Sequence, residues 1–283
     1  MAFKEQALSF RCGVDWLYGV ASLPPGPCAR GVLVVVGGPQ YRAGSHRQFT
    51  LLARSLADNG IAAMRFDYRG MGDSQGDARD FEAVGQDLQA AIDTFMQTVP
   101  GMCEVVLWGL CDAASAITIY APSDARVSGI VLLNPWVRTD DGLARATLKH
   151  YYRARLLERA FWLKLLCGRF DLRHSLASMT SLARSALRRG APGGAETGSD
   201  APLPERMRAG MRDFKGRVLV IIGGADLTGR EFCDLAGVDP VWKRLMEAPR
   251  VTRHQIDKAD HTFSRRAWRD QVADWTRDWV RSW

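Results

Sequence analysis

Short continuous runs of apolar residues alternate along the chain with stretches where apolar residues recur every three or four positions. Val32–Val36 is a continuous, mostly β-branched run, typical of a strand buried on both faces of a parallel sheet. Similar runs predict strands at 62–66, 105–108, 129–133, 218–222 and 251–256. Helical spacing predicts helices at 46–58, 79–98, from the end of the 105–108 strand to Tyr120, at 228–247 and at 264–280. Two alternating runs, Gln6–Phe10 and Asp15–Ser22, predict antiparallel edge strands. Strands alternating with helices predict a doubly wound, mostly parallel α/β sheet.

The stretch between the strands ending at Leu133 and starting at Val218 is too long for one crossover between neighbouring strands. Its part at 143–189 is rich in leucine, alanine and arginine and is predicted to be mostly helical, whereas 190–204 is predicted to be a flexible loop of Gly and Pro. We therefore expect a helical cap at 134–216, inserted into a core made of 1–133 and 217–283.

Composition narrows the class of protein. Apolar residues make up 47% of the chain and charged residues 24%, as in ordinary globular proteins. No apolar run approaches the roughly 18 residues that span a bilayer, and the first residues lack a secretory pattern, so we expect a cytoplasmic protein. The cysteines lack metal-ligand spacing, which favours reduced thiols and no metal or cofactor: Cys12, Cys28, Cys103, Cys111, Cys167 and Cys233.

The net charge of +7 is concentrated in the predicted cap. Residues 138–190 contain twelve lysines and arginines against four acidic residues. A solvated surface is one interpretation, and contact with an anionic head group or a membrane surface is another, because aromatic residues interleave with the arginines. No nucleic-acid-reading motif is present, so nucleic acid is not expected as a partner.

The stretch "LWGLCDAASAI" at 107–117 places small residues around a cysteine where a strand meets a helix. This is the pattern of a nucleophile elbow, G-x-S-x-G, in which a sharp turn presents one side chain at its apex. Here the pattern is G-x-C-x-A, so Cys111 stands in the place of serine. A helix N-terminus and a nearby imidazole favour a thiolate, so we expect Cys111 to be the nucleophile.

A thiol nucleophile needs a base, and the base needs an orienting carboxylate. Asp226 follows the 218–222 strand and His261 follows the last strand, in the order nucleophile, acid, base. We expect His261 to be the base and Asp226 the acid. The simpler alternatives are a solvated loop histidine and a turn aspartate, with Asp260 or Asp257 as the acid. The other histidines fit less well, because they begin a helix, lie in the cap or lie within a strand: His46, His150, His174 and His254.

Acyl transfer also needs hydrogen-bond donors for an oxyanion. One is the backbone N–H of the residue after the nucleophile, Asp112, and the other comes from the loop after 32–36. Pro39 has no N–H, which leaves Gly38, with Gln40 behind it. The Asp112 carboxylate would oppose ionisation of the neighbouring thiol unless it points away. Alternatively it caps the start of the helix.

The segment "FDYRGMGDSQGD" at 66–77 resembles the tight D-x-R-G-x-G-x-S loop of many α/β-hydrolases. With the elbow, Asp226 and His261, the resemblance to that superfamily covers nearly the whole chain and implies an α/β-hydrolase fold. More narrowly, residues 37–77, "GLCDAASA" and "LLNPWVRT" look like the first type of exosortase A system-associated hydrolase. Members of that group are encoded beside bacterial exopolysaccharide and protein-sorting machinery, which does not identify a substrate.

These residues predict a cysteine-dependent acyl hydrolase or acyltransferase that acts on an ester or thioester through an acyl-thioenzyme. A cysteine at this position is compatible with catalysis, as the resemblance to dienelactone hydrolases implies. We assign substrate contacts to Trp136 and Tyr41. The competing hypothesis is a non-catalytic protein that uses the same pocket to hold an acyl or lipid ligand.

Overall fold

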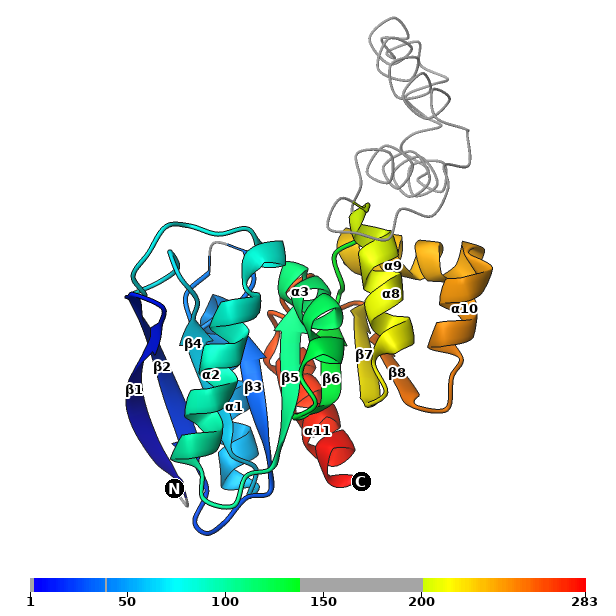
Figure 1. Ribbon diagram of the computed structural model, residues 1–283. Helices are drawn as coiled ribbons and strands as arrows, with labels where there is room; N and C mark the ends of the chain where they lie inside the picture. The colour runs from blue at the N-terminus through cyan, green and yellow to red at the C-terminus, as the bar shows by residue number, and fades with distance from the viewer. Residues whose placement is uncertain (1–2, 39, 138–200) are drawn as a thin grey trace, which may run out of the picture. The chain divides into compact units, whose positions relative to one another are not determined.

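The computed structural model describes residues 3–38, 40–137 and 201–283. Within them, strands form one sheet in the order β1-β2-β4-β3-β5-β6-β7-β8 (Figure 1). The strands are β1 (Lys4–Cys12), β2 (Asp15–Leu23), β3 (Arg30–Val35), β4 (Ala63–Asp67), β5 (Glu104–Leu110), β6 (Val127–Leu133), β7 (Arg217–Gly223) and β8 (Val251–Ile256). β1 pairs with β2, and β2 with β4, in antiparallel fashion, whereas the pairings from β4 to β8 are parallel. The predicted mostly parallel sheet with antiparallel edge strands is confirmed.

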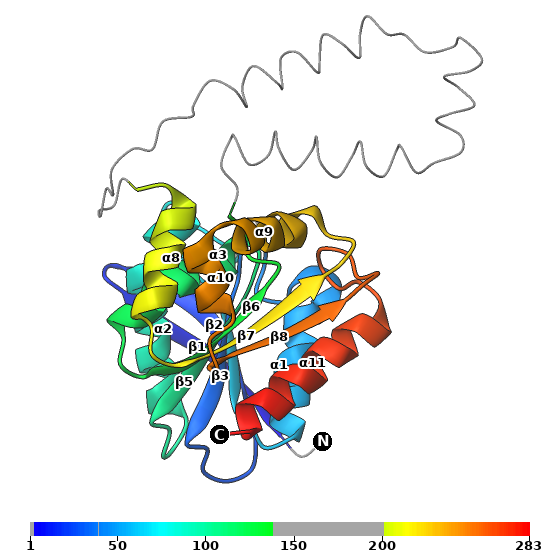
Figure 2. The same cartoon turned by 90° about the vertical axis from the view of Figure 1, so that its right-hand side faces the viewer.

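Helices cover both faces of this sheet. Figure 2 shows α1 and α11 together on one face and α2 and α3 on the other. The helices are η1 (Ser45–Arg47), α1 (Gln48–Asp58), η2 (Phe81–Ala83), α2 (Gly85–Thr98), α3 (Asp112–Tyr120), η3 (Ala121–Ser123), α8 (Leu203–Asp213), α9 (Leu227–Val238), α10 (Pro240–Met246) and α11 (Arg266–Arg281). This layering buries the apolar strand runs, because helix faces cover them from both sides.

Three predicted helices differ from those in the structure. The helix predicted at 46–58 begins at Gln48, because His46 and Arg47 have left-handed backbones, with φ 52° and 59°. The helix predicted at 79–98 begins only at Gly85, after the short turn η2, which Asp80 caps by accepting from the Glu82 N–H at 2.9 Å. The helix predicted at 228–247 is divided into α9 and α10 at Pro240. Proline has no N–H and clashes with the preceding turn, so it begins a helix more readily than it continues one.

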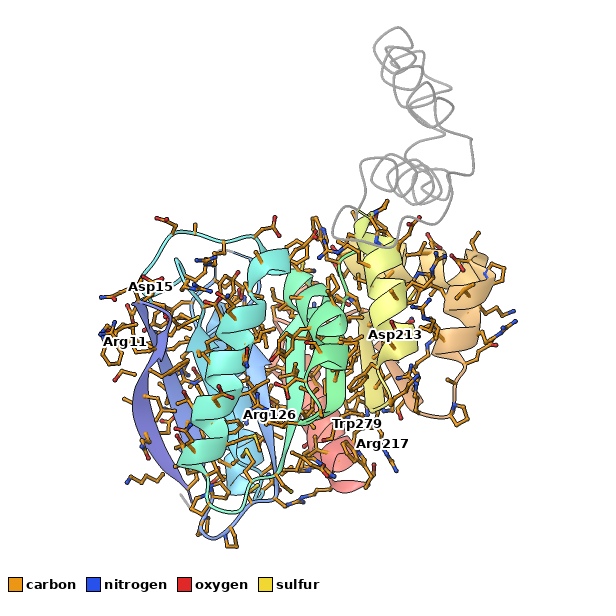
Figure 3. All side chains as sticks on the ribbon, in the orientation of Figure 1. Arg11, Asp15, Arg126, Asp213, Arg217 and Trp279 are labelled. Carbon is orange, nitrogen blue, oxygen red and sulfur yellow. The ribbon has the colours of Figure 1, made fainter. Side chains whose placement is uncertain are left out.

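The core beneath the candidate site lies between the sheet and the pair α1 and α11. Trp108 of β5 and Phe49 of α1 are both buried there and meet edge to face, with ring centroids 5.6 Å apart. Farther along α11, Trp279 packs so closely on β6 that a Cβ at Gly129 would lie 2.9 Å from its ring (Figure 3). Truncating a buried tryptophan of this kind to alanine costs about 3–5 kcal/mol. These contacts fix the strands whose ends carry the candidate site.

The chain divides into two compact units, 1–136 with 207–283, and 137–206. All residues of the candidate site belong to the first. Most of the predicted cap at 134–216, including nearly all of its loop at 190–204, lies outside the described residues, so the cap stays a prediction. Among the described helices, none has the length and apolar character needed to cross a membrane.

Candidate active site

Cys111 lies at the turn between β5 and α3, where its backbone adopts φ 63° and ψ −125°. Such a conformation costs a residue with a Cβ about 1–3 kcal/mol, so the surrounding structure must hold it. The Cys111 N–H donates to the Leu133 carbonyl at 2.9 Å, and its carbonyl accepts from the Trp136 N–H at 3.2 Å. A Cβ at Gly109 would lie 2.7 Å from the Ala113 backbone, which explains the small residues on both sides of the apex. The strained turn places the Cys111 side chain beyond the end of the sheet.

His261 follows β8 and lies between a carboxylate and the Cys111 side chain. Its Nδ1 is 3.1 Å from Asp226 Oδ1. The hydrogen bond with Asp226 and, next, the hydrogen bond with Cys111 raise the pKa of His261 from 6.5 to about 10, against the opposing effect of burial. The ring is therefore an imidazolium at neutral pH. The structure thus brings the three side chains predicted for the catalytic group together.

Asp226 is buried and uses both carboxylate oxygens. While Oδ1 faces His261, Oδ2 accepts from the Gly229 N–H at 2.9 Å and caps the start of α9. The alternative acids are occupied elsewhere. Asp260 accepts from the backbone and the hydroxyl of Ser264, and Asp257 accepts from the side chain of a glutamine two residues before it. The geometry favours Asp226 as the partner of the imidazole.

The other described histidines have different surroundings. His254 stacks on Trp275 of α11, with ring centroids 4.3 Å apart, and burial lowers its pKa. His46 lies in η1 with a left-handed backbone, φ 52°. His150 and His174 lie outside the described residues. Among the described histidines, His261 is the one that the structure places against the cysteine.

Asn134, directly after β6, connects the ends of three strands. Its N–H donates to the Ile221 carbonyl at 3.1 Å, and its side-chain oxygen accepts from the Gly223 N–H at 2.7 Å. Its Nδ2 donates to the His261 carbonyl at 3.0 Å. The side chain is fully buried and the backbone is left-handed, φ 41°. The sequence reasoning assigned Asn134 no role. The available signal was a polar residue that ends a continuous apolar run and precedes a proline.

The predicted oxyanion donors are close together, but their N–H groups are engaged. The Gly38 N–H donates to Asp112 Oδ2 at 2.8 Å, and the Ala113 N–H donates to Asp112 Oδ1 at 2.9 Å. The N–H of Asp112 also bonds to its own carboxylate, while the Gln40 N–H donates to the Gly38 carbonyl at 2.8 Å. Burial raises the pKa of Asp112, whereas these bonds and the His261 charge oppose the rise. The carboxylate does not point away from the elbow, and its bond at the start of α3 partly matches the capping alternative.

Comparisons with known proteins place this geometry in a family. None of the curated proteins matches the sequence. Residues 27–261 match the family model described as serine aminopeptidase, S33. The chain belongs to this family of α/β-hydrolases. The match spans the strand leading into the Gly37–Gly38 loop, the elbow, Asp226 and His261, so it covers all parts of the candidate site.

Solved structures share the fold of this α/β-hydrolase at low sequence identity. An esterase from Pyrococcus furiosus is 15% identical, with a TM-score of 0.63 over 98% of this chain and 93% of the other. A dienelactone hydrolase from Anabaena variabilis is 16% identical, with a TM-score of 0.59 over 99% of this chain and 98% of the other. Identities this low establish the fold alone.

The S33 family description names a serine enzyme, whereas this α/β-hydrolase has Cys111 at the elbow. Within the elbow pattern, the apex and the last position depart from G-x-S-x-G, because Cys111 replaces serine and Ala113 replaces glycine. A backbone strained at the apex, a histidine after the last strand and an acid after β7 are all present. The exosortase-associated subtype, which rests on the resemblance above, stays a prediction.

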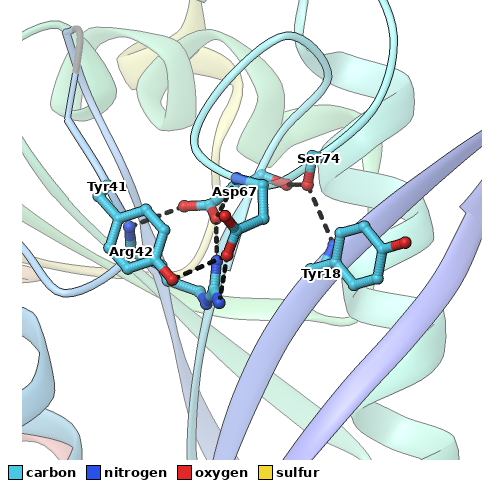
Figure 4. Close-up of polar contacts among 6 residues, drawn as sticks. Tyr18, Tyr41, Arg42, Asp67 and Ser74 are labelled. Atoms are coloured by element: carbon cyan, nitrogen blue, oxygen red, sulfur yellow. Dashed lines mark hydrogen bonds and ion pairs between the residues drawn. The ribbon is translucent and has the colours of Figure 1, made fainter.

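The D-x-R-G-x-G-x-S segment of this hydrolase forms a scaffold for the loop after β3. Asp67 is fully buried, and its carboxylate accepts from the Arg42 backbone N–H at 2.7 Å and from the Arg42 guanidinium (Figure 4). Ser74 donates to the Asp67 carbonyl at 2.6 Å and accepts from the Tyr18 N–H at 3.0 Å. A Cβ at Gly72 would lie 2.3 Å from Asp67 Oδ2, so the loop closes tightly on the carboxylate. This cluster holds the segment that contains Gly37, Gly38 and Tyr41.

The two residues predicted to contact substrate have different surroundings. Tyr41 is 44% exposed, and its hydroxyl donates to Asp73 Oδ2 at 2.8 Å while Arg42 stacks on its ring. Trp136 follows Asn134, and its backbone holds the elbow from the opposite side. Substrate contact by either residue stays a prediction.

Proposed function

We propose that this α/β-hydrolase is a cysteine-dependent acyl hydrolase or acyltransferase with Cys111 as nucleophile, His261 as acid and base, and Asp226 as the orienting carboxylate. The observation that carries the proposal is the contact of His261 with both partners at a strained elbow. A merely structural cysteine needs neither a left-handed backbone nor an imidazolium. The names of the structural neighbours, an esterase and a dienelactone hydrolase, support ester cleavage.

Acylation begins when the Cys111 sulfur attacks the carbonyl carbon of an ester or thioester. A C–S bond forms and the carbonyl π electrons move to oxygen, giving a tetrahedral oxyanion. The intermediate collapses, the bond to the leaving group breaks, and His261 gives its proton to the departing oxygen or sulfur. Because the pKa of His261 is raised to about 10, this proton is already on the ring at neutral pH. The product is an acyl-thioenzyme with a neutral imidazole.

Release of the acyl group reverses these roles. The neutral His261 takes a proton from water or from another acceptor, whose oxygen, nitrogen or sulfur attacks the thioester carbon. The second tetrahedral intermediate collapses to a free acid or a transferred acyl group, and the Cys111 sulfur leaves as a thiolate beside the imidazolium. Asp226 keeps the ring oriented through both steps and favours its charged form.

One observation favours the second candidate, a protein that binds an acyl or lipid ligand without turnover. The Gly38 N–H, one of the groups expected to stabilise the oxyanion, donates to the Asp112 carboxylate instead. The two hypotheses differ in what happens at Cys111, because only an enzyme forms and then loses a covalent acyl group.

The test combines alkylation and acylation of Cys111. Iodoacetamide labelling followed by peptide mass spectrometry should modify Cys111 faster than the exposed Cys103, which serves as the internal control. Incubation with a panel of p-nitrophenyl esters and alkyl thioesters should then add one acyl group to the intact protein, and Cys111→Ala should abolish the addition. If no ester or thioester acylates Cys111, the enzyme proposal is wrong, whether or not Cys111 is alkylated faster than Cys103.

A further inference from the structure

The Asp112 carboxylate fills the space between the loop after β3 and the start of α3. Its two oxygens accept from the Gly38 N–H and the Ala113 N–H at 2.8 and 2.9 Å, and its own N–H also points to it. Gly38 and Asp112 are 74 residues apart in sequence, and their bond joins the loop after β3 to the first residue of α3, directly after Cys111. An oxyanion formed at Cys111 needs donors at this same place.

The surrounding backbone is shaped to accept this carboxylate. A Cβ at Gly37 would lie 2.1 Å from Asp112 Oδ1, so only glycine leaves room for it. Gly38 has φ +58°, in the left-handed region, and that conformation directs its N–H to Asp112 Oδ2. The helix N-terminus and the charge of His261 both favour an anion at this position. The space beside Gly37, the N–H donor of Gly38 and the charge of His261 therefore all favour an anion at this position. In this structure the anion is the carboxylate of Asp112.

We propose that Asp112 determines specificity at this site: its carboxylate occupies the position of the substrate oxyanion, and acylation proceeds only with substrates that displace it. The inference rests on the proposed function, because it concerns the oxyanion of the acylation step. Displacement breaks charge-assisted hydrogen bonds, so a substrate must compensate with binding energy from groups remote from the scissile carbonyl. Small esters without such groups are poor substrates of the parent protein, and larger acyl substrates are better ones.

The test compares Asp112→Ala with the parent protein in two reactions of the same sulfur. Acylation by p-nitrophenyl acetate develops an oxyanion, whereas alkylation by iodoacetamide displaces iodide at a saturated carbon and develops none. Losing one oxyanion donor slows catalysis by about 100- to 1,000-fold, so freeing the occupied donors should speed acylation by at least about 10-fold. Removing the neighbouring negative charge also favours the Cys111 thiolate, which speeds both reactions, so the acylation rate is divided by the alkylation rate of the same protein. This ratio should rise by at least about 10-fold in Asp112→Ala.

Asp112→Asn is the matched variant, since an amide keeps the shape but its NH₂ group cannot accept from an N–H. The acylation rate of Asp112→Asn should fall between those of the parent and Asp112→Ala. If Asp112→Ala does not fold, the comparison of Asp112→Asn with the parent remains the test.

The outcomes separate the two proposals. If the parent is acylated readily and both variants are acylated no faster, the inference about Asp112 is wrong while the proposed function stands. If neither the parent nor the variants are acylated by any ester although Cys111 is alkylated, the proposed function itself fails. A higher ratio of acylation to alkylation in both variants than in the parent supports the inference.

Discussion

The loops after β7 and β8 and the loop after β3 approach the same cysteine, but they differ in what occupies them. On the β7 and β8 side, Asp226 orients His261 at 3.1 Å, and the buried Asn134 holds both loops through neutral amide hydrogen bonds. On the β3 side, the Gly38 N–H is already bound to the Asp112 carboxylate. In the proposed acid–base half, His261 contacts both of its predicted partners, whereas the Gly38 N–H of the proposed oxyanion half is already bound to a carboxylate of the chain itself.

This difference teaches that bringing the predicted catalytic residues together does not by itself make an open site. Groups that stabilise a transition state act only when the substrate can reach them, and donors that already bind an anion are not available to a second one. Each half can be altered separately, because its residues come from different elements. The following predictions do so, in order of decreasing effect.

The largest effect is expected for Cys111→Ser, which tests the acid–base half. An alcohol needs a base to remove its proton, but Asp226 keeps the pKa of His261 raised and the ring protonated at neutral pH. Acylation by a thioester should fall by at least about 100-fold, as when a general base is lost. The acylation rate is measured with a chromogenic thioester. A Tm equal to that of the parent protein shows that the variant is folded. Equal or faster acylation by the serine variant would mean that the cysteine is incidental.

The next effect is expected for Asn134→Ala, which loosens the β7 and β8 side. The Gly223 N–H and the His261 carbonyl lose their buried partner, so the free energy of unfolding should fall by about 2–4 kcal/mol. Misplacing His261 should also lower kcat by about 10-fold. Urea denaturation and steady-state assays measure the two quantities.

The matched control for that change is Thr276→Ala in α11. Thr276 is equally buried and donates to the Val272 carbonyl at 2.8 Å, a bond that lies wholly within α11 and involves none of the site residues. Thr276→Ala should lower the free energy of unfolding without changing kcat. If both variants reduce kcat in proportion to stability, Asn134 has no positioning role.

The sequence predicted the acid–base half well, because each of its residues follows a strand in a fixed chain order. Cys111, Asp226 and His261 could be placed once the strands at 105–108, 218–222 and 251–256 were recognised. Asn134 was missed because its partners come from two other strand ends and have no local pattern. The Asp112 carboxylate is held by Gly38, which is 74 residues away in sequence. The sequence alone therefore could not decide whether this carboxylate points away from the thiol or caps the start of the helix. The apolar spacing of 228–247 continues through Pro240, but proline has no N–H to continue a helix, and α10 begins there.

A smaller effect is expected from pH, through His261. Its pKa is raised from 6.5 to about 10 in the folded protein, so its contribution to stability is fully present below about pH 6.5 and is lost as pH rises through 10. The difference in free energy of unfolding between the parent and His261→Gln should therefore be largest near pH 6 and shrink towards pH 10. Urea denaturation of both proteins across this range measures it, and other titrating groups cancel in the difference. A difference that grows with pH would contradict the imidazolium assignment.

The smallest effect is expected for Tyr41→Phe, on the β3 side. The hydroxyl bonds to Asp73 at the surface, and the loop is held mainly by Arg42 and the buried Asp67, so Tm should stay within about 2 °C. The ring, not the hydroxyl, is the part available to an apolar substrate, because the hydroxyl already has a partner. Tyr41→Phe should therefore leave KM within about 2-fold, whereas Tyr41→Ala should raise KM for a long-chain acyl ester by several-fold, as expected when apolar contact area is lost. If Tyr41→Ala leaves KM unchanged for short and long acyl chains alike, the predicted substrate contact at Tyr41 is wrong, and the β3 side contributes through Gly38 and Asp112 alone.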